Sequence, residues 1–144
     1  MTAAPHSFPV RVYWEDTDGS GIVYHASYLR FAERARTELL RAAGFEQWSM
    51  LAETGIAFAV RHCAIDFRRS ARLDDQLLVE TRVTAIGGAS LEMSQAIRRD
   101  GDDIVTLLLK LACITRDGRA ARMPPRLREV FNAIKDQTAS HAAE

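Results

Sequence analysis

Residues 14–31 of this chain read Trp-Glu-Asp-Thr-Asp-Gly-Ser-Gly-Ile-Val-Tyr-His-Ala-Ser-Tyr-Leu-Arg-Phe. Three acidic side chains, Glu15, Asp16 and Asp18, lie in a short glycine-containing loop, and His25 follows at the entry to an amphipathic helix. A helix start offers free backbone N–H groups and a positive dipole end, both suited to a developing oxyanion. A carboxylate delivered there can act as a nucleophile or as a base toward water. The stretch therefore predicts an acyl-transfer site.

The strongest helix in the sequence follows directly, over residues 28–43. Two alanines in the middle of its apolar face let the helix axis lie close to whatever it covers, and Gly44 is suited to end it. The apolar positions keep the 4-3-4-4 spacing of a single helix face: Tyr28, Ala32, Ala35, Leu39 and Ala43.

The rest of the chain has the period of two that is typical of strands. Turn residues at 73–75, 87–88 and 100–101 predict three hairpins in succession, which is an antiparallel meander. A short helical turn at 45–53, a terminal helix at 126–135 and a flexible tail at 136–144 complete the chain. Strands are expected over 9–14, 56–69, 77–83, 91–97 and 104–116.

The strand over 104–116 is apolar on both faces, unlike a strand with one solvated side. Such a strand should be central and covered twice, and the chain has a single long helix to offer. Each leucine or valine left in water would forfeit roughly 1.5–3 kcal/mol relative to burial. The sequence therefore predicts that a second subunit covers the other face.

Length and composition indicate one globular domain, 1–144, with an ordered core over about 9–135. The 144 residues are 47% hydrophobic and 26% charged, with a net charge of zero, which argues against a nucleic-acid partner. No apolar run is long enough to span a bilayer, and the N-terminus does not resemble a secretion signal. Cys63 and Cys113 fit buried thiols in a reducing compartment, so a cytoplasmic location is expected.

Three sequence segments carry a family resemblance: Tyr-Trp-Glu-Asp-Thr-Asp (13–18), Gly-Ile-Val-Tyr-His-Ala-Ser-Tyr-Leu (21–29) and Glu-Arg-Ala-Arg-Thr-Glu (33–38). They resemble the 4-hydroxybenzoyl-CoA thioesterase family of hotdog proteins, most closely its YbgC branch of acyl-CoA thioesterases associated with the Tol–Pal system. The likeness continues through Ala-Arg-Leu-Asp-Asp (71–75) and covers about 10–125. It implies an α+β hotdog fold, a five-stranded antiparallel sheet of order 1-3-5-4-2 around one long helix.

The resemblance also implies how the site works. The family's catalytic aspartate falls on Asp18 and its frequent histidine partner on His25, with a backbone N–H at the helix start polarising the thioester carbonyl. The substrate would be a thioester of CoA or acyl-carrier protein, with no cofactor. Subunits of the family pair edge to edge, dimers associate into tetramers, and active sites lie at the dimer interface. Peripheral association with membrane-lipid enzymes is a further expectation.

Other residues are assigned to substrate binding or to the loop. Asp16 is expected to organise the loop through backbone N–H groups. A serine after a glycine pair, Ser90, sits where hotdog proteins often contact the pantetheine arm, although it also suits an ordinary hairpin. Close relatives often carry tyrosine at position 14, where this chain has tryptophan. The acyl-site candidates are Trp14, Gly21, Val23 and Tyr24, and the candidates for the CoA phosphates are Arg68, Arg69 and Arg72.

Two alternatives to the thioesterase interpretation remain open, besides a metal site that the residue spacing disfavours. A metal site built from Asp16, Asp18 and His25 lacks a second histidine or a cysteine at useful spacing, so no metal is expected. A non-catalytic acyl-CoA-binding protein would bind the substrate without releasing thiol. A hotdog hydratase or dehydratase would act on an enoyl group, and the segment 13–38 speaks against it.

Overall fold

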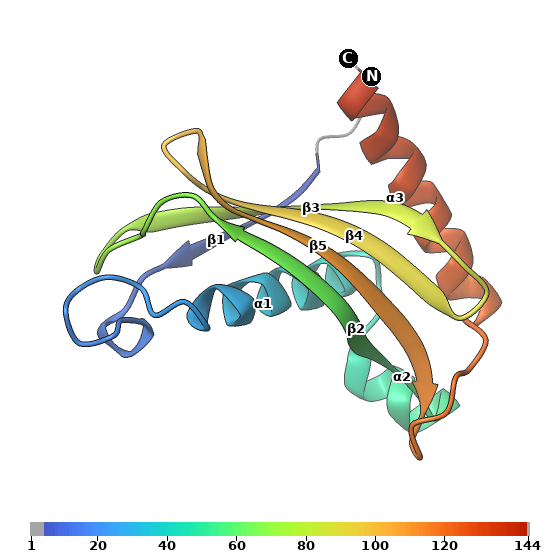
Figure 1. Ribbon diagram of the computed structural model, residues 1–144. Helices are drawn as coiled ribbons and strands as arrows, with labels where there is room; N and C mark the ends of the chain where they lie inside the picture. Colours follow the sequence, from blue (N-terminus) through green and yellow to red (C-terminus); the bar gives the residue numbers. More distant parts are fainter. Residues whose placement is uncertain (1–4, 144) are drawn as a thin grey trace.

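One antiparallel sheet of five strands curves over helix α1 in the computed structural model (Figure 1). The structure describes the backbone of residues 5–143 and the side chains of 5–135. The predicted α+β class, with a sheet wrapped around a long helix, is confirmed, but the expectation of a single long helix is wrong, because the terminal helix at 125–143 is longer than the one beneath the sheet. The elements are β1 (His6–Arg11), η1 (Trp14–Asp16), α1 (Ser27–Ala42), α2 (Gln47–Thr54), β2 (Ile56–Phe67), β3 (Gln76–Ile86), β4 (Ser90–Arg99), β5 (Asp102–Thr115) and α3 (Pro125–Ala143).

The strand order is β1-β3-β4-β5-β2, so β4 and β5 exchange places relative to the expected 1-3-5-4-2. Two tight hairpins impose this order. One joins β3 to β4 over the glycine pair 87–88, and the other joins β4 to β5 where Asp100 (φ 52°) and Gly101 (φ 85°) supply the positive dihedrals of a two-residue turn. Consecutive strands in such turns must be neighbours.

The prediction of a hairpin at 73–75 is wrong. Strand β2 pairs with β5 at one edge of the sheet, and β3 pairs with β1 at the other. The segment 68–75 therefore crosses from one edge to the other instead of closing a turn. Turn residues identify a reversal of the chain but not the strand that pairs across it, so the sequence pattern alone misassigned this connection.

The first strand and the long helix differ slightly from their predicted bounds. Strand β1 lies at 6–11 rather than 9–14, because the chain turns into the short helix η1 and the Tyr13 N–H donates to the Asp16 carboxylate. Helix α1 matches its prediction to within one residue at each end, and Gly44 follows it with φ 91°. Helix α3 begins at Pro125 and runs past 135, and the side chains of the predicted tail, 136–144, lie outside the described part.

The core lies on the side of the sheet that faces α1. The predicted helix face is buried, with Ala32 and Ala35 fully enclosed and Tyr28 and Leu39 nearly so. The short side chains let α1 lie close beneath the sheet. A second cluster at the other end of the sheet joins α2 and α3 to the strands through Met50, Leu127, Phe131 and their neighbours.

Strand β5 lies between β4 and β2, as expected of a central strand. Its residues Leu107, Leu109 and Leu111 are buried toward α1, whereas Leu108 on the opposite face is 62% exposed. Nothing in the described part of the chain covers Leu108. Among the described helices, none has the length and hydropathy needed to span a bilayer. Both cysteines are free thiols, Cys113 buried and Cys63 half-buried.

Candidate active site

The acidic loop is held in shape by Asp16, which is only 5% exposed. Its carboxylate accepts a hydrogen bond from the Tyr13 N–H at 2.8 Å, and its carbonyl accepts one from the Tyr24 N–H at 2.9 Å. Gly19 and Gly21 adopt φ values of 92° and 95°, which favour glycine, and turn the chain between these anchors. The prediction that Asp16 organises the loop agrees with these bonds.

Asp18 lies at the tip of this loop with its side chain in solvent. Its Oδ1 atom accepts two hydrogen bonds from Ser20, one from the backbone N–H at 2.8 Å and one from the hydroxyl at 2.5 Å. These bonds, the hydroxyl first, lower the pKa of Asp18 below the usual aspartate value. The side chain is therefore a carboxylate at neutral pH, the form that can attack a carbonyl or accept a proton from water.

Asp18 and His25 line one open cleft of about 420 Å³ at the start of α1. The His25 ring is exposed and stands edge-on to the Phe67 ring, with 6.3 Å between centroids, and 4.5 Å from the Tyr24 ring. Tyr24, Val23, Arg68 and Arg69 also line the cleft. The structure thus brings together residues from the loop, the helix start and the end of β2.

The backbone at the start of α1 narrows the choice of oxyanion donors. The Tyr24 N–H already bonds the Asp16 carbonyl, and the Ser27 N–H bonds the Tyr24 carbonyl at 2.8 Å. Ala26 precedes the helix and offers no side-chain cap. The amides of His25, Ala26 and Tyr28 do not take part in these bonds, so they are the candidates for holding a reacting oxygen at the positive end of the α1 dipole.

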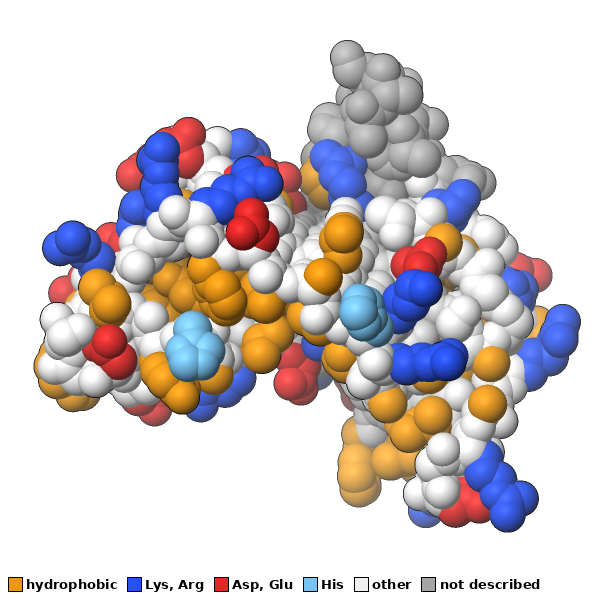
Figure 2. Space-filling view, in the orientation of Figure 1, with side chains coloured by type: hydrophobic (Ala, Val, Ile, Leu, Met, Phe, Trp, Pro, Cys, Tyr) orange, Lys and Arg blue, Asp and Glu red, His pale blue; other side chains and the backbone are white. Residues whose placement is uncertain are grey.

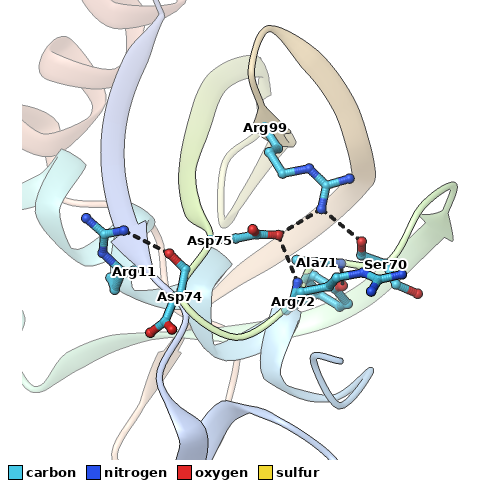
Figure 3. Close-up of polar contacts among 8 residues, drawn as sticks. Arg11, Ser70, Ala71, Arg72, Asp74, Asp75 and Arg99 are labelled. Atoms are coloured by element: carbon cyan, nitrogen blue, oxygen red, sulfur yellow. Dashed lines mark hydrogen bonds and ion pairs between the residues drawn. The ribbon is translucent and has the colours of Figure 1, made fainter. Parts of the chain in front are cut away.

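The segment 68–75, which carries the cleft arginines, is fastened by an ion pair (Figure 3). The Arg99 guanidinium donates to the Asp75 carboxylate at 2.8 Å and to the Ser70 carbonyl at 3.0 Å. The Arg72 N–H also donates to the Asp75 carboxylate, at 2.9 Å. Burial alone would raise the pKa of Asp75, but the bonds from Arg72 and Arg99 together hold it below its usual value.

Further bonds tie the same segment to the rest of the protein. The Ala71 N–H donates to the buried Tyr28 hydroxyl at 2.9 Å, and the Arg11 guanidinium donates to the Asp74 carbonyl at 2.8 Å. The Leu73 N–H donates to the Gly21 carbonyl, so the segment is also joined to the acidic loop. The loop with Asp18 and the segment with the cleft arginines therefore form one connected unit.

Four predicted binding residues do not line the cleft. The side chain of Arg72 is not among its lining residues, although the Arg72 backbone bridges to Ile22 beside it. Gly21 lies between the lining residues Asp18 and Ile22, and its carbonyl accepts the bond from the Leu73 N–H. Trp14 is 62% exposed on η1, away from the cleft lining. Ser90 begins β4, at the other end of that strand from the cleft.

The sequence did not single out Phe67, Tyr28 or Ile22 as site residues, yet all three line the cleft. Phe67 and Tyr28 look like ordinary apolar positions of a strand and a helix, and no sequence signal distinguishes them. Among the described residues, no group of three or more His, Cys, Asp or Glu side chains is placed to hold a metal ion.

Comparisons with known proteins identify the family and the fold. Residues 12–131 match the family model of the thioesterase-like superfamily. The chain is 43% identical over 130 residues to the acyl-CoA thioesterase YbgC of Haemophilus influenzae, covering 90% of this chain and 96% of that protein. It is 51% identical over 97 residues to the acyl-CoA thioester hydrolase YbgC of Escherichia coli O6:H1, covering 67% and 72%. A crystal structure of a probable thioesterase from Bartonella henselae superposes with a TM-score of 0.81 at 40% identity, covering 84% and 100%.

Proposed function

This chain belongs to the thioesterase-like superfamily and is an acyl-CoA thioester hydrolase, and we propose that the cleft around Asp18 and His25 is its active site. The observation that carries the proposal is the position of Asp18, an exposed carboxylate beside the start of α1. A thiolate leaves readily because its conjugate acid has a pKa of about 8.5. The site therefore needs no strong general acid, only an activated oxygen nucleophile and an oxyanion donor.

Asp18 supplies the oxygen chemistry in this proposal. Because Oδ1 is held by Ser20, Oδ2 faces the substrate and either attacks the thioester carbonyl or takes a proton from an attacking water. In the first route an acyl-aspartyl anhydride forms, the thiolate leaves, and water then hydrolyses the anhydride. In the second route water adds directly and the C–S bond breaks. Both routes give the free acid and the thiol.

The oxyanion is assigned to the His25 and Ala26 amides at the start of α1. Main-chain donors at a helix start are fixed before the reaction and stabilise charge where it develops. The His25 ring, exposed beside Asp18 and braced by Tyr24 and Phe67, orients the carbonyl or the attacking water.

Arg68 and Arg69 are assigned to the phosphates of CoA. Both line the cleft, and their side chains are more than half exposed, paired with Asp66 and Asp102 at the surface. Such surface pairs contribute little and exchange easily for a phosphate. An acyl-carrier protein would present a phosphopantetheine to the same arginines. Arg72, whose side chain is not among the residues lining the cleft, has the weaker case.

We assign the protein a homodimer in which two β2 edge strands pair, and a dimer of dimers built from it. Strand β2 ends the sheet, and its residues Val60 and Phe67 are 50% and 46% exposed in one subunit. Pairing would cover these side chains and remove an unpaired strand edge. Phe67 also lines the cleft, so the active site would lie at this interface. The face with Leu108 is left for the second contact.

We also propose that the protein is cytoplasmic and that it contacts membrane-lipid enzymes peripherally. The free state of Cys63 and Cys113 supports a reducing compartment.

A panel of acyl-CoA esters, scored by release of free thiol, tests the reaction. We expect the wild-type protein to release thiol from at least one class of acyl-CoA, and the release to depend on Asp18. Tight binding of acyl-CoA with no thiol release from any ester would contradict the hydrolase and favour the non-catalytic acyl-CoA-binding protein.

A further inference from the structure

A second cavity, of about 240 Å³, opens between α1 and β2. Seven of its eleven lining residues are apolar, among them Phe58, Val60, Met93 and Leu111, and the other four are polar or charged. Arg36 of α1 lines the same cavity. An arginine beside apolar walls loses hydration, which costs free energy. Hydrogen bonds or ion pairs of the guanidinium must offset this cost.

Arg36 is held in place by a buried amide. Its Nη1 donates to Oε1 of Gln95 at 2.9 Å. The Gln95 amide nitrogen in turn donates to the Ala32 carbonyl and the Thr81 hydroxyl, both at 3.0 Å. Gln95 and Thr81 are buried, so this support is rigid. One nitrogen of the guanidinium is thus fixed, and its remaining N–H groups are presented at a defined place.

No described carboxylate forms an ion pair with this guanidinium. Arg36 has no carboxylate partner within 4.0 Å among residues 5–135, and Glu33, one helix turn earlier on the cavity rim, acts on it only at longer range. Burial, partly opposed by Glu33, lowers the pKa of Arg36 below its usual value. A guanidinium has five N–H donors and prefers oxygen acceptors. The cavity therefore combines apolar walls with donors that the protein itself does not saturate.

The cavity and the Asp18 cleft open on the same seam between α1 and β2, where Figure 2 shows hydrophobic side chains gathered. Arg36 lies ten residues after Ala26 on α1, or about 15 Å along the helix. In the proposed dimer, antiparallel pairing of two β2 strands sets the start of one beside the end of the other. The Arg36 cavity, near the start of β2, then faces the partner's cleft, near the end. In either arrangement an acyl chain whose thioester lies in an Asp18 cleft would extend toward this cavity.

We propose that this cavity binds the far end of the acyl group and that Arg36 selects acyl groups that carry a hydroxyl or carboxylate oxygen there. The inference rests on the proposed function, because it names the substrate class of the same site. The apolar walls hold the hydrocarbon part, and the guanidinium held by Gln95 donates to the oxygen. A plain alkyl chain fills the cavity but leaves these donors without an acceptor.

Three matched esters test the selection: decanoyl-CoA, ω-hydroxydecanoyl-CoA and decanedioyl-CoA, with acetyl-CoA as a substrate too short to reach Arg36. We expect the kcat/KM of at least one oxygen-bearing ester to exceed that of decanoyl-CoA by about tenfold, the effect of a hydrogen bond to a charged group. Arg36→Met should abolish the preference and leave acetyl-CoA turnover unchanged. Comparing kcat/KM for the hydroxyl ester and the carboxylate ester shows whether Arg36 prefers a neutral or a charged acceptor.

Arg34→Met is the control, because Arg34 is exposed on the same helix and lines a different surface hollow. It should keep the wild-type preference. An active wild-type enzyme that handles all three long esters equally, or an Arg36→Met variant that keeps the preference, would overturn the inference. If Arg36→Met does not fold, as judged by circular dichroism, Arg36→Lys takes its place, since an ammonium lacks the planar fork.

Direct binding separates this inference from the proposed function. Calorimetry with three thioether analogues of CoA that cannot be hydrolysed, carrying decyl, 10-hydroxydecyl and 9-carboxynonyl groups on sulfur, needs no turnover, so it decides the matter even if no ester releases thiol. Tighter binding of an oxygen-bearing analogue by wild type, lost in Arg36→Met, supports the cavity. Equal binding of all three analogues refutes it, whatever the thioesterase assay shows.

Discussion

Ser20 donates both its backbone N–H and its hydroxyl to the same oxygen of Asp18, at 2.8 and 2.5 Å. The two bonds fix the direction of an otherwise exposed side chain and leave the second oxygen free for the cleft. They also stabilise the ionised form, which is why the pKa of Asp18 lies below the usual aspartate value. A loop of only three residues, Asp-Gly-Ser (18–20), thus provides an ionised, oriented carboxylate without burying it.

We expect Asp18→Asn to remove most thioesterase activity, on the order of 10²–10⁴-fold in kcat, the usual contribution of a positioned base. The amide is nearly isosteric and its oxygen can still accept from Ser20, but it is neither a nucleophile nor an effective base. The side chain is exposed, so the thermal melt and assembly should match wild type. Glu15→Gln, another exposed loop carboxylate, is the control. An Asp18→Asn variant with near wild-type kcat refutes the assignment.

Ser20→Ala should shift the acid side of the pH–activity profile to higher pH. The Ser20 hydroxyl bond is the largest of the effects that lower the pKa of Asp18, so its loss raises this pKa although the backbone N–H bond remains, and a higher pH is then needed to keep the carboxylate ionised. Profiles of kcat/KM against pH for Ser20→Ala and for Ser20→Thr, which keeps the hydroxyl, make the comparison. An unmoved acid limb in Ser20→Ala means that the ionisation of Asp18 does not control the reaction.

His25→Ala should reduce kcat by about tenfold, less than the Asp18 change, because main-chain oxyanion donors survive truncation of the ring. Steady-state kinetics of the two variants on one ester provide the test. Equal inactivation of both would give His25 a direct chemical role, and full activity in His25→Ala would make it a bystander.

Much of the fold follows from local patterns in the sequence. The spacing of Tyr28, Ala32, Ala35 and Leu39 predicted α1 and its buried face, because helix periodicity depends only on nearby residues. The turn chemistry at 87–88 and 100–101 likewise predicted two hairpins. Pairing between distant strands is not local. The placement of β2 beside β5 depends on how the segment 68–75 crosses the sheet, and no short pattern encodes it.

The candidate site also contains residues that a local pattern predicts and residues that only the strand topology brings together. Asp18, His25 and Asp16 stand in one continuous motif, so the sequence could propose them together, and the structure places Asp18 and His25 on one cleft with Asp16 bonded to the backbone of the loop. Phe67 reaches the same cleft from the end of β2, far along the chain, through the sheet topology alone. Arg72 was grouped with Arg68 and Arg69 by proximity in sequence, but its side chain is not among those lining the cleft. Proximity along an irregular segment does not fix side-chain direction.

The protein should be at least a homodimer in solution. The exposed Val60 and Phe67 beside an unpaired strand edge make an apolar seam that association would cover. Val60→Asp should weaken the dimer, since it would bury a charge without a partner. Leu108→Asp, on the outer face of the sheet, should spare the dimer and weaken only a dimer of dimers. Light scattering coupled to size exclusion measures the mass of each variant. An active wild-type species of monomer mass at micromolar concentration would refute the interfacial site.

The ion pair between Asp75 and Arg99 should stabilise the fold in a pH-dependent way and position the cleft arginines. The pKa of Asp75 is lowered in the folded state, so its contribution is fully present above the unfolded aspartate pKa and is lost as pH falls through the folded one. We expect Asp75→Asn to cost about 1 kcal/mol in urea unfolding at neutral pH, because both side chains are largely shielded from solvent. The difference from wild type should shrink below the usual aspartate pKa.

The same variant should raise KM for acyl-CoA more than it lowers kcat, because the Asp75 carboxylate holds the segment with Arg68 and Arg69 and not the carbonyl chemistry at Asp18. Asp117→Asn removes an exposed pair with Arg119 elsewhere and should change neither quantity. Urea unfolding at several pH values and steady-state kinetics on one ester measure both effects. A stability difference that persists unchanged into acid, or a loss confined to kcat, would show that Asp75 does not act through its ionised carboxylate on this segment.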